Sequence, residues 1–179
     1  MTRYVVMGST GTGKTTFAAR LARKLNVPHI EGDTLIWLPG WQRRAPADFA
    51  ADVERQTAAE AWVFDGCYSD AVMQPVWERA QTIIWLDYPR WQIHWQVFKR
   101  CIGDIISGRN VWNGNRETWK RAFFSRQSIL LYSLKSYGEH RRAFMEIVEA
   151  RHKQGQTVQA FRSATQAENF LNSLYLNHR

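Results

Sequence analysis

At 179 residues the chain has the length of a single folded domain, and its 45% hydrophobic and 22% charged residues exclude an intrinsically disordered protein. Its two cysteines, Cys67 and Cys101, offer neither a disulfide framework nor the spacing of a zinc site, and no apolar run approaches the roughly 20 residues of a membrane span. A formal net charge of +8 indicates an anionic partner: nucleic acid, an anionic membrane surface or a phosphorylated substrate.

The first elements alternate between strand and helix. Residues 3–7 (RYVVM) are β-branched and aromatic, which predicts a buried strand. After a glycine-rich break, Phe17, Leu21 and Leu25 recur every fourth residue and predict a helix over 14–25. The next predicted elements are a strand at 28–31, an irregular segment at 34–46 and a helix at 48–61.

The middle of the chain continues this alternation. A helix predicted over about 90–107 has an apolar face that we expect to pack into the core, together with Trp85 of the preceding strand and Cys101. The residues of that face are Trp91, Trp95, Phe98, Ile102, Ile105 and Ile106. The other predicted elements here are a strand at 62–64, a helix at 70–80 and a strand at 82–86.

The last third begins with a loop rich in Asn, Trp and Arg at about 107–118. A long helical region then runs from about 118 to 153, and we expect it to break near Gly138. Strands that alternate with helices predict βαβ units, a parallel sheet and an α/β fold in one domain, 1–179. The closing elements are a strand at 156–161 and a helix at 164–176.

Residues 8–15 read GSTGTGKT and match the phosphate-binding loop (P-loop) pattern G-x-x-x-x-G-K-[ST]. Its glycines let successive N–H groups turn toward a phosphate, and the helix that follows adds the positive end of its dipole. Lys14 can reach the β- and γ-phosphates of ATP, and the Thr15 hydroxyl can ligate Mg²⁺. The predicted nucleotide-binding residues are Gly8, Ser9, Thr10, Gly11, Thr12, Gly13, Lys14, Thr15 and Thr16.

Three aspartates, Asp33, Asp65 and Asp87, each follow a predicted strand. Ligands of open parallel sheets bind outside the carboxyl ends of the strands, so we expect all three near the P-loop. Asp65 and Asp87 are both candidates for the acidic residue that positions Mg²⁺. Asp33 is a candidate for orienting or deprotonating an acceptor hydroxyl. Asp87 is also placed to cap the helix that starts near residue 90.

A basic stretch over 100–126 combines glycines with five arginines, as expected for a lid that closes over a transferring phosphoryl group. Arg109 and Arg116 lie in its loop and are predicted catalytic residues, with a solvated basic surface as the alternative. Arg121 and Arg126 fit that alternative better. In the irregular segment after Asp33, two tryptophans either form an apolar wall for an acceptor ring or anchor the loop; they are Trp37 and Trp41.

The chain resembles the adenylate-kinase-like P-loop kinases, and most closely the group labelled DNA topology modulation proteins. The resemblance lies in GSTGTGKT at 8–15, DTLIWLPGW at 33–41, FDGCYS at 64–69 and IIWLDYPRW at 83–91. It implies a three-layer P-loop NTPase fold with a five-stranded sheet ordered 2-3-1-4-5. It also implies Asp65 as the water-mediated metal partner, an acceptor-binding excursion at 33–61 and a helical lid at 100–126.

Two positions depart from adenylate kinases, where arginines hold the phosphate of the acceptor. Ile36 follows Leu35 where one such arginine is expected, and a Cys-Tyr-Ser sequence at 67–69 stands near the other. A nucleoside monophosphate acceptor would then need another arginine. The candidates are Arg43, Arg44 and Arg90.

We therefore predict an ATP·Mg²⁺-dependent phosphotransferase whose small acceptor is a nucleotide, a nucleoside or another hydroxyl or phosphate compound. The alternatives are a nucleotide-dependent regulator that binds nucleic acid, supported by the charge and aromatic content, and a slow ATPase without a small-molecule acceptor. The motif begins at Gly8, which leaves no room for a signal peptide before it. We expect a cytoplasmic monomer or homodimer with no membrane partner.

Overall fold

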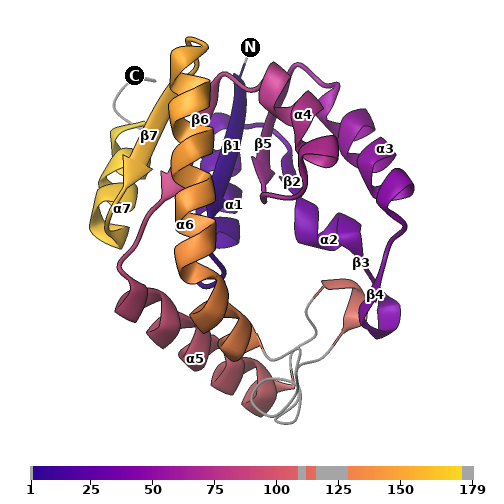
Figure 1. Ribbon diagram of the computed structural model, residues 1–179, viewed down its shortest axis with the longest axis vertical. Coiled ribbons are helices and arrows are strands. Elements are labelled where there is room, and N and C mark those ends of the chain that lie inside the picture. The colour runs from indigo at the N-terminus through magenta and orange to yellow at the C-terminus, as the bar shows by residue number, and fades with distance from the viewer. Residues whose placement is uncertain (1, 109–111, 116–128, 175–179) are drawn as a thin grey trace.

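The computed structural model describes residues 2–108, 112–115 and 129–174. They form an α/β fold in which a five-stranded parallel sheet lies between two layers of helices (Figure 1). The strand order β2-β5-β1-β6-β7 confirms the predicted order 2-3-1-4-5 of the sheet strands. These strands are β1 (Thr2–Gly8), β2 (His29–Glu31), β5 (Ala61–Asp65), β6 (Thr82–Leu86) and β7 (Thr157–Phe161).

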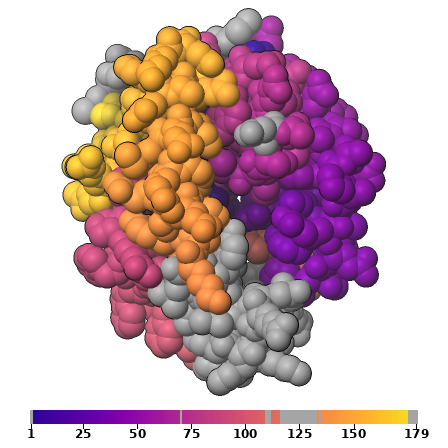
Figure 2. Space-filling model, viewed as in Figure 1, coloured from indigo at the N-terminus to yellow at the C-terminus, as the bar shows by residue number. Residues whose placement is uncertain are grey.

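Alternating side chains of the strands build a core on each face of the sheet. In β1, Val5 and Met7 belong to one core and Val6 to the other, and all three are fully buried. Helices cover both faces, which explains why the strands are continuous apolar runs. The Val5 face carries α3 (Pro46–Thr57), α4 (Asp70–Arg79) and α6 (Ile129–Lys153), which form much of the surface in Figure 2. The Val6 face carries α1 (Lys14–Leu25), α5 (Arg90–Ser107) and α7 (Ala164–Ser173).

The segment after β2, predicted to be irregular over 34–46, is more ordered than expected. A short helix leads into an antiparallel hairpin in which Trp37 pairs with Arg43. Gly40 makes the turn after Pro39 with a φ of +74°, a conformation that favours glycine. The elements of this excursion are α2 (Gly32–Ile36), β3 (Trp37–Leu38), the 3₁₀ turn η1 (Pro39–Trp41) and β4 (Gln42–Arg43).

Helix α3 ends at Thr57 rather than at residue 61, where the sequence prediction placed its end. The indole Nε1 of Trp62 donates a hydrogen bond to the Thr57 carbonyl oxygen at 3.0 Å. That contact satisfies a carbonyl that the helix would otherwise leave without a partner, so the chain can turn into β5.

The predicted buried face of α5 is wrong, because that stripe faces away from the core. Trp91 is 71% exposed and Trp95 is 54% exposed. Ile93, Val97 and Cys101 face the core instead, about half a turn around the helix. Ile93 and Val97 lie next to Gly11 of the P-loop, so this side of α5 packs against the loop as well as the core. The expected burial of Trp85 and Cys101 is confirmed.

Helix α6 runs from Ile129 to Lys153 without the break expected near Gly138. A helical glycine costs about 1 kcal/mol relative to alanine, and packing of the flanking turns offsets that cost. Tyr137 and Phe144 contribute to that packing, one against each core of the sheet. Among the described residues, no helix has the length and apolar character to span a membrane.

Candidate active site

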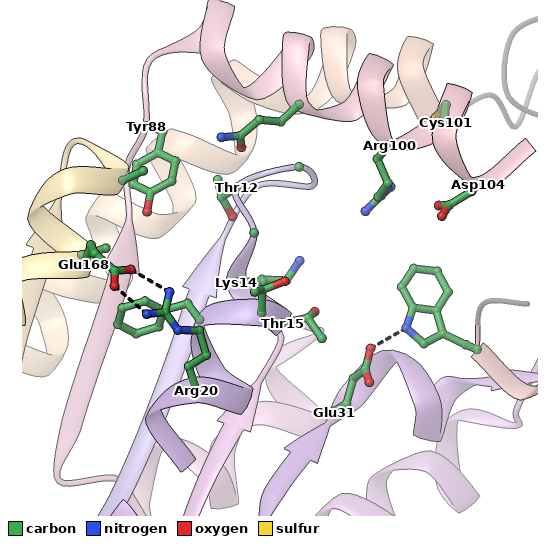
Figure 3. Close-up of a pocket in the computed structure, with 18 of the residues that line it drawn as sticks. Thr12, Lys14, Thr15, Arg20, Glu31, Tyr88, Arg100, Cys101, Asp104 and Glu168 are labelled. Atoms are coloured by element: carbon green, nitrogen blue, oxygen red, sulfur yellow. Dashed lines mark hydrogen bonds and ion pairs between the residues drawn. The ribbon is translucent and has the colours of Figure 1, made fainter. Parts of the chain in front are cut away.

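A cleft of about 710 Å³ opens beyond the carboxyl ends of the strands. The P-loop and the first turns of α1 form its floor, and α5, the start of α7 and the 3₁₀ turn η2 (Trp112–Gly114) form its walls (Figure 3). Lys14 and Thr15 from the floor and Arg100 from α5 lie around the same open space in this view. The cleft therefore brings a phosphate-binding motif and a second cation together.

The P-loop has the conformation that its sequence predicts. Gly11 and Gly13 have φ values of +93° and +79°, and α1 begins directly afterwards with no acidic residue in its first turn. The Thr12 hydroxyl donates a hydrogen bond to the Ser9 carbonyl oxygen at 2.9 Å and braces the loop. Of the nine predicted nucleotide-binding residues, those from Gly11 to Thr16 line the cleft. Gly8, Ser9 and Thr10 precede them in the sequence and do not line it.

Asp65 ends β5 beside the start of the P-loop. It pairs in register with Val6 of β1, and the N–H of the next residue, Gly66, donates to the Val6 carbonyl oxygen at 3.2 Å. Its side chain is 2% exposed, and neither carboxylate oxygen has a hydrogen-bond partner among the described residues. His29 Nε2 lies 3.8 Å from Oδ2, which is beyond hydrogen-bond distance. A buried carboxylate without partners is costly unless a further group binds it.

Asp87 directly follows β6, and both of its carboxylate oxygens are hydrogen-bonded. Its two oxygens accept hydrogen bonds from Nε and Nη2 of Arg141 in α6, at 2.8 and 2.9 Å. The expected capping of the following helix is wrong, since Pro89 occupies the cap position and no side chain caps the helix. The two aspartates that the sequence left as alternatives for the metal therefore have different surroundings.

Glu31 ends β2 and Asp33 lies in the first turn of α2, on the side of the cleft opposite α5. We call this side, formed by residues 31–41, the excursion bank. The Tyr68 hydroxyl donates to Asp33 Oδ1 at 3.0 Å, and Trp112 Nε1 donates to Glu31 Oε1 at 2.5 Å. Burial raises the pKa of Tyr68 well above its usual value, and the negative charges of Asp33, Asp65 and Glu31 raise it further. Three carboxylates therefore gather around one un-ionised phenol.

The turn η2 attaches to the excursion through two asparagines that the sequence analysis did not single out. Asn113 Nδ2 donates to the carbonyl oxygens of Thr34 and Trp37, at 2.9 and 2.5 Å. Asn115 accepts from the Trp41 N–H at 2.8 Å and donates to the Leu38 carbonyl oxygen at 3.0 Å. These contacts join residues more than 70 positions apart, which no local pattern in the sequence can indicate.

Three tryptophans support the same attachment. The Trp37 and Trp41 rings meet edge to face at 5.7 Å, and the Trp41 and Trp112 rings meet likewise at 6.2 Å. Trp37 and Trp41 thus anchor their segment, which was one of the two roles considered for them.

The lid is described only in part. Arg109, Arg116, Arg121 and Arg126 lie outside the described residues. Arg100, at the start of the predicted lid, belongs to α5 and lines the cleft.

The cleft edge near α7 holds an ion pair between α1 and α7 that the sequence analysis did not identify. Arg20 Nη1 donates to Glu168 Oε2 at 2.6 Å (Figure 3), and this bond lowers the pKa of Glu168. Pairing over 148 positions gives no local sequence signal.

The arginines considered as substitutes for an acceptor-phosphate site make other contacts. Arg44 forms an ion pair with Asp52, the Arg43 guanidinium lies 5.5 Å above the Trp37 ring, and Arg90 Nε donates to His94 Nε2 at 3.1 Å. No group of three or more His, Cys, Asp or Glu side chains suited to a metal ion occurs among the described residues.

No protein-family model and no curated protein sequence matches the chain. Among solved structures, it is similar to a shikimate kinase from Bacteroides thetaiotaomicron, with a TM-score of 0.61 and 15% identity over 98% of this chain and 97% of that chain. A gluconokinase from Sinorhizobium meliloti 1021 gives a TM-score of 0.49 and 17% identity over 99% and 98% of the two chains. The chain therefore shares the overall fold of that shikimate kinase.

Proposed function

We propose that the chain is an ATP·Mg²⁺-dependent phosphotransferase that moves the γ-phosphoryl group of ATP to a small acceptor. One observation carries this proposal: the buried carboxylate of Asp65, which accepts no hydrogen bond among the described residues, lies beside a P-loop that opens into a cleft. Mg²⁺ keeps several of its waters and is held by few protein groups together with substrate phosphates. A lone carboxylate suits that mode of binding, in which it orders a metal-bound water.

The residues of the floor have distinct proposed roles. The N–H groups of the P-loop and the positive end of α1 hold the phosphates, and Lys14 neutralises the charge that develops during transfer. The Thr15 hydroxyl and the Asp65 carboxylate are the groups that would hold Mg²⁺. When bound, the ion supplies charge neutralisation at the β- and γ-phosphates. Arg100 is the described residue best placed to add a second positive charge, and Arg109 and Arg116 remain predictions.

The acceptor site is proposed on the bank formed by residues 31–41, where Asp33 faces the acceptor. In this part of the cleft, Glu31 and Trp112 line the wall, and the Trp41 ring packs against Trp112 from behind that lining. The finer resemblance to DNA topology modulation proteins, the cytoplasmic location and the monomeric or homodimeric state stay predictions. So do the two alternatives, a nucleic-acid-binding regulator and a slow ATPase.

The test is ADP release from ATP·Mg²⁺ with nucleosides, nucleoside monophosphates and small alcohols as acceptors. Lys14→Ala is the control, since it removes the P-loop cation. An acceptor-dependent increase that disappears in the variant supports the proposal. A slow background that depends on Lys14 but on no acceptor supports the ATPase instead. Binding to single-stranded nucleic acid that weakens steeply with salt, without transfer, supports the regulator.

A further inference from the structure

Tyr68 lies beyond the carboxyl end of β5, next to the start of the excursion that follows β2. It follows β5 by three residues, and its side chain reaches the loop after β2.

The ring of Tyr68 is wedged between the loops that follow β2 and β5. A Cβ atom added at Gly32 or at Gly66 would lie 2.5 Å from Cε2 of the ring, closer than real contacts allow. Phe49 and Phe64 meet the ring edge to face, at 4.9 and 6.4 Å. Glycine on both sides and aromatic rings beside it fix the position of the phenol.

The hydroxyl of this fixed ring donates to Asp33 Oδ1 at 3.0 Å. The bond occupies one oxygen of Asp33 and orients the carboxylate, and no hydrogen bond to Oδ2 occurs among the described residues. A carboxylate that is held in this way accepts a hydrogen bond from an alcohol and repels a phosphate. Glu31, on the same bank, adds a second negative charge that an anionic acceptor group would meet.

We propose that Tyr68 positions Asp33 to receive the proton of an acceptor hydroxyl, so that the enzyme phosphorylates an alcohol rather than a phosphate. The inference rests on the proposed phosphotransferase activity and names its acceptor class. In the transfer step, the hydroxyl oxygen forms a bond to the γ-phosphorus while the bond from the γ-phosphorus to the β–γ bridging oxygen breaks. The hydroxyl proton passes to Asp33 and then to solvent, ADP leaves, and the product is a phosphate monoester.

The acceptor class is tested with matched pairs: nucleosides against their 5′-monophosphates, and glycerol against glycerol 3-phosphate. ³¹P NMR separates the monoester expected from an alcohol from the anhydride formed on a phosphate. Lys14-dependent monoester formation supports the inference. Lys14-dependent anhydride formation overturns the inference while the proposed kinase activity stands. No transfer to any compound overturns both.

The role of Tyr68 is tested with Tyr68→Phe, which removes the hydroxyl and keeps the ring. We expect kcat to fall about 10- to 100-fold, part of the usual contribution of an acid–base group, while KM for ATP stays unchanged. Tyr4→Phe, near the amino end of β1, is the matched control and keeps wild-type kcat. Adding Tyr68→Phe to Asp33→Asn produces no further loss if Tyr68 acts through Asp33.

Two results overturn the positioning role. The first is a wild-type kcat in Tyr68→Phe. The second is multiplication of the Tyr68→Phe and Asp33→Asn effects in the double variant, because residues that act through one another are not additive. Unfolding in urea, which we expect to be little changed in Tyr68→Phe, separates either result from loss of the fold.

Discussion

Arg141 of α6 holds Asp87 at the end of β6 through two hydrogen bonds from one guanidinium, at 2.8 and 2.9 Å. The Asp87 side chain is 7% exposed. Such two-pronged pairs fix geometry as well as charge, so this pair ties α6 to the sheet. Asp65 ends the strand on the other side of β1 and has no comparable partner among the described residues.

This contrast predicts that the two aspartates respond differently to substitution. ATP·Mg²⁺ at 100 times its dissociation constant should stabilise the wild-type protein by about 2.7 kcal/mol. We expect Asp65→Asn to lose most of the Mg²⁺-dependent part of that increase, because an amide is a poor partner for a metal-bound water. Asp87→Asn should keep it. Urea unfolding with ATP, in Mg²⁺ or in EDTA, measures both, and equal losses would contradict the assignment of Asp65.

Arg141→Ala should lower the free energy of unfolding by about 1–3 kcal/mol, because it leaves the buried Asp87 carboxylate unpaired. Arg142→Ala is the matched control. It removes the neighbouring, exposed arginine and should change stability by less than about 0.5 kcal/mol. Urea titrations followed by circular dichroism give both values. Equal midpoints for the two variants would show that the ion pair contributes nothing.

Gly138→Ala should stabilise the protein by about 0.5–1 kcal/mol. Gly138 lies inside α6, and a Cβ atom added there meets nothing within 4 Å. The contrasting variant is Gly108→Ala at the end of α5, where a φ of +59° should make the substitution destabilising. The difference in melting temperature between the two variants checks the prediction, and a destabilising Gly138→Ala would refute it.

The P-loop should tolerate alanine differently at two of its glycines. Both have positive φ, but a Cβ at Gly11 would lie 2.3 Å from Cγ2 of Val97, whereas one at Gly13 meets nothing within 4 Å. Gly13→Ala should cost about 1–2 kcal/mol through its backbone alone. Gly11→Ala should cost more, and adding Val97→Ala should recover part of the difference in urea unfolding. If the effects of Gly11→Ala and Val97→Ala on the free energy of unfolding simply added up, there would be no close contact between the P-loop and α5.

Acidification should weaken the fold through two histidines. Burial lowers the pKa of both His94 and His140 from 6.5, and the charge of Lys14 contributes at His140. Because the unfolded chain binds these protons more tightly, the unfolding free energy should fall as the pH drops below about 6.5. His140→Gln should make that fall shallower. Urea unfolding at pH 7 and pH 5 measures the slope, and an unchanged slope in the variant would contradict the prediction.

The sequence predicted the parts of this protein that depend on local chemistry. The P-loop follows from its glycines and Lys14, and the five sheet strands follow from their apolar runs. The strand order came from the resemblance to P-loop kinases and is confirmed. The rule that such ends meet at one edge of a sheet also led us to expect Asp33, Asp65 and Asp87 near the P-loop, but none of the three lines the cleft.

Features set by distant contacts were not predictable. α5 has apolar residues on two faces, and periodicity alone cannot tell which of them meets the P-loop; the larger aromatic stripe suggested the wrong one. The partner of Asp87 is 54 positions away, and that of Asp33 is 35 positions away. A glycine suggests a helix break locally, but the packing of α6 against the sheet decides the outcome at Gly138.

The attachment of η2 to the excursion has a consequence for how this protein can diversify. Within the described part of the chain, the side chains of Asn113 and Asn115 bind main-chain atoms of the excursion: the carbonyls of Thr34, Trp37 and Leu38 and the N–H of Trp41. Side chains of the excursion other than Trp37 and Trp41, whose rings support the attachment, can therefore change in evolution without loss of these hydrogen bonds. Substitutions in the excursion could therefore alter the surface of the cleft while the P-loop floor and the attachment of η2 are inherited intact.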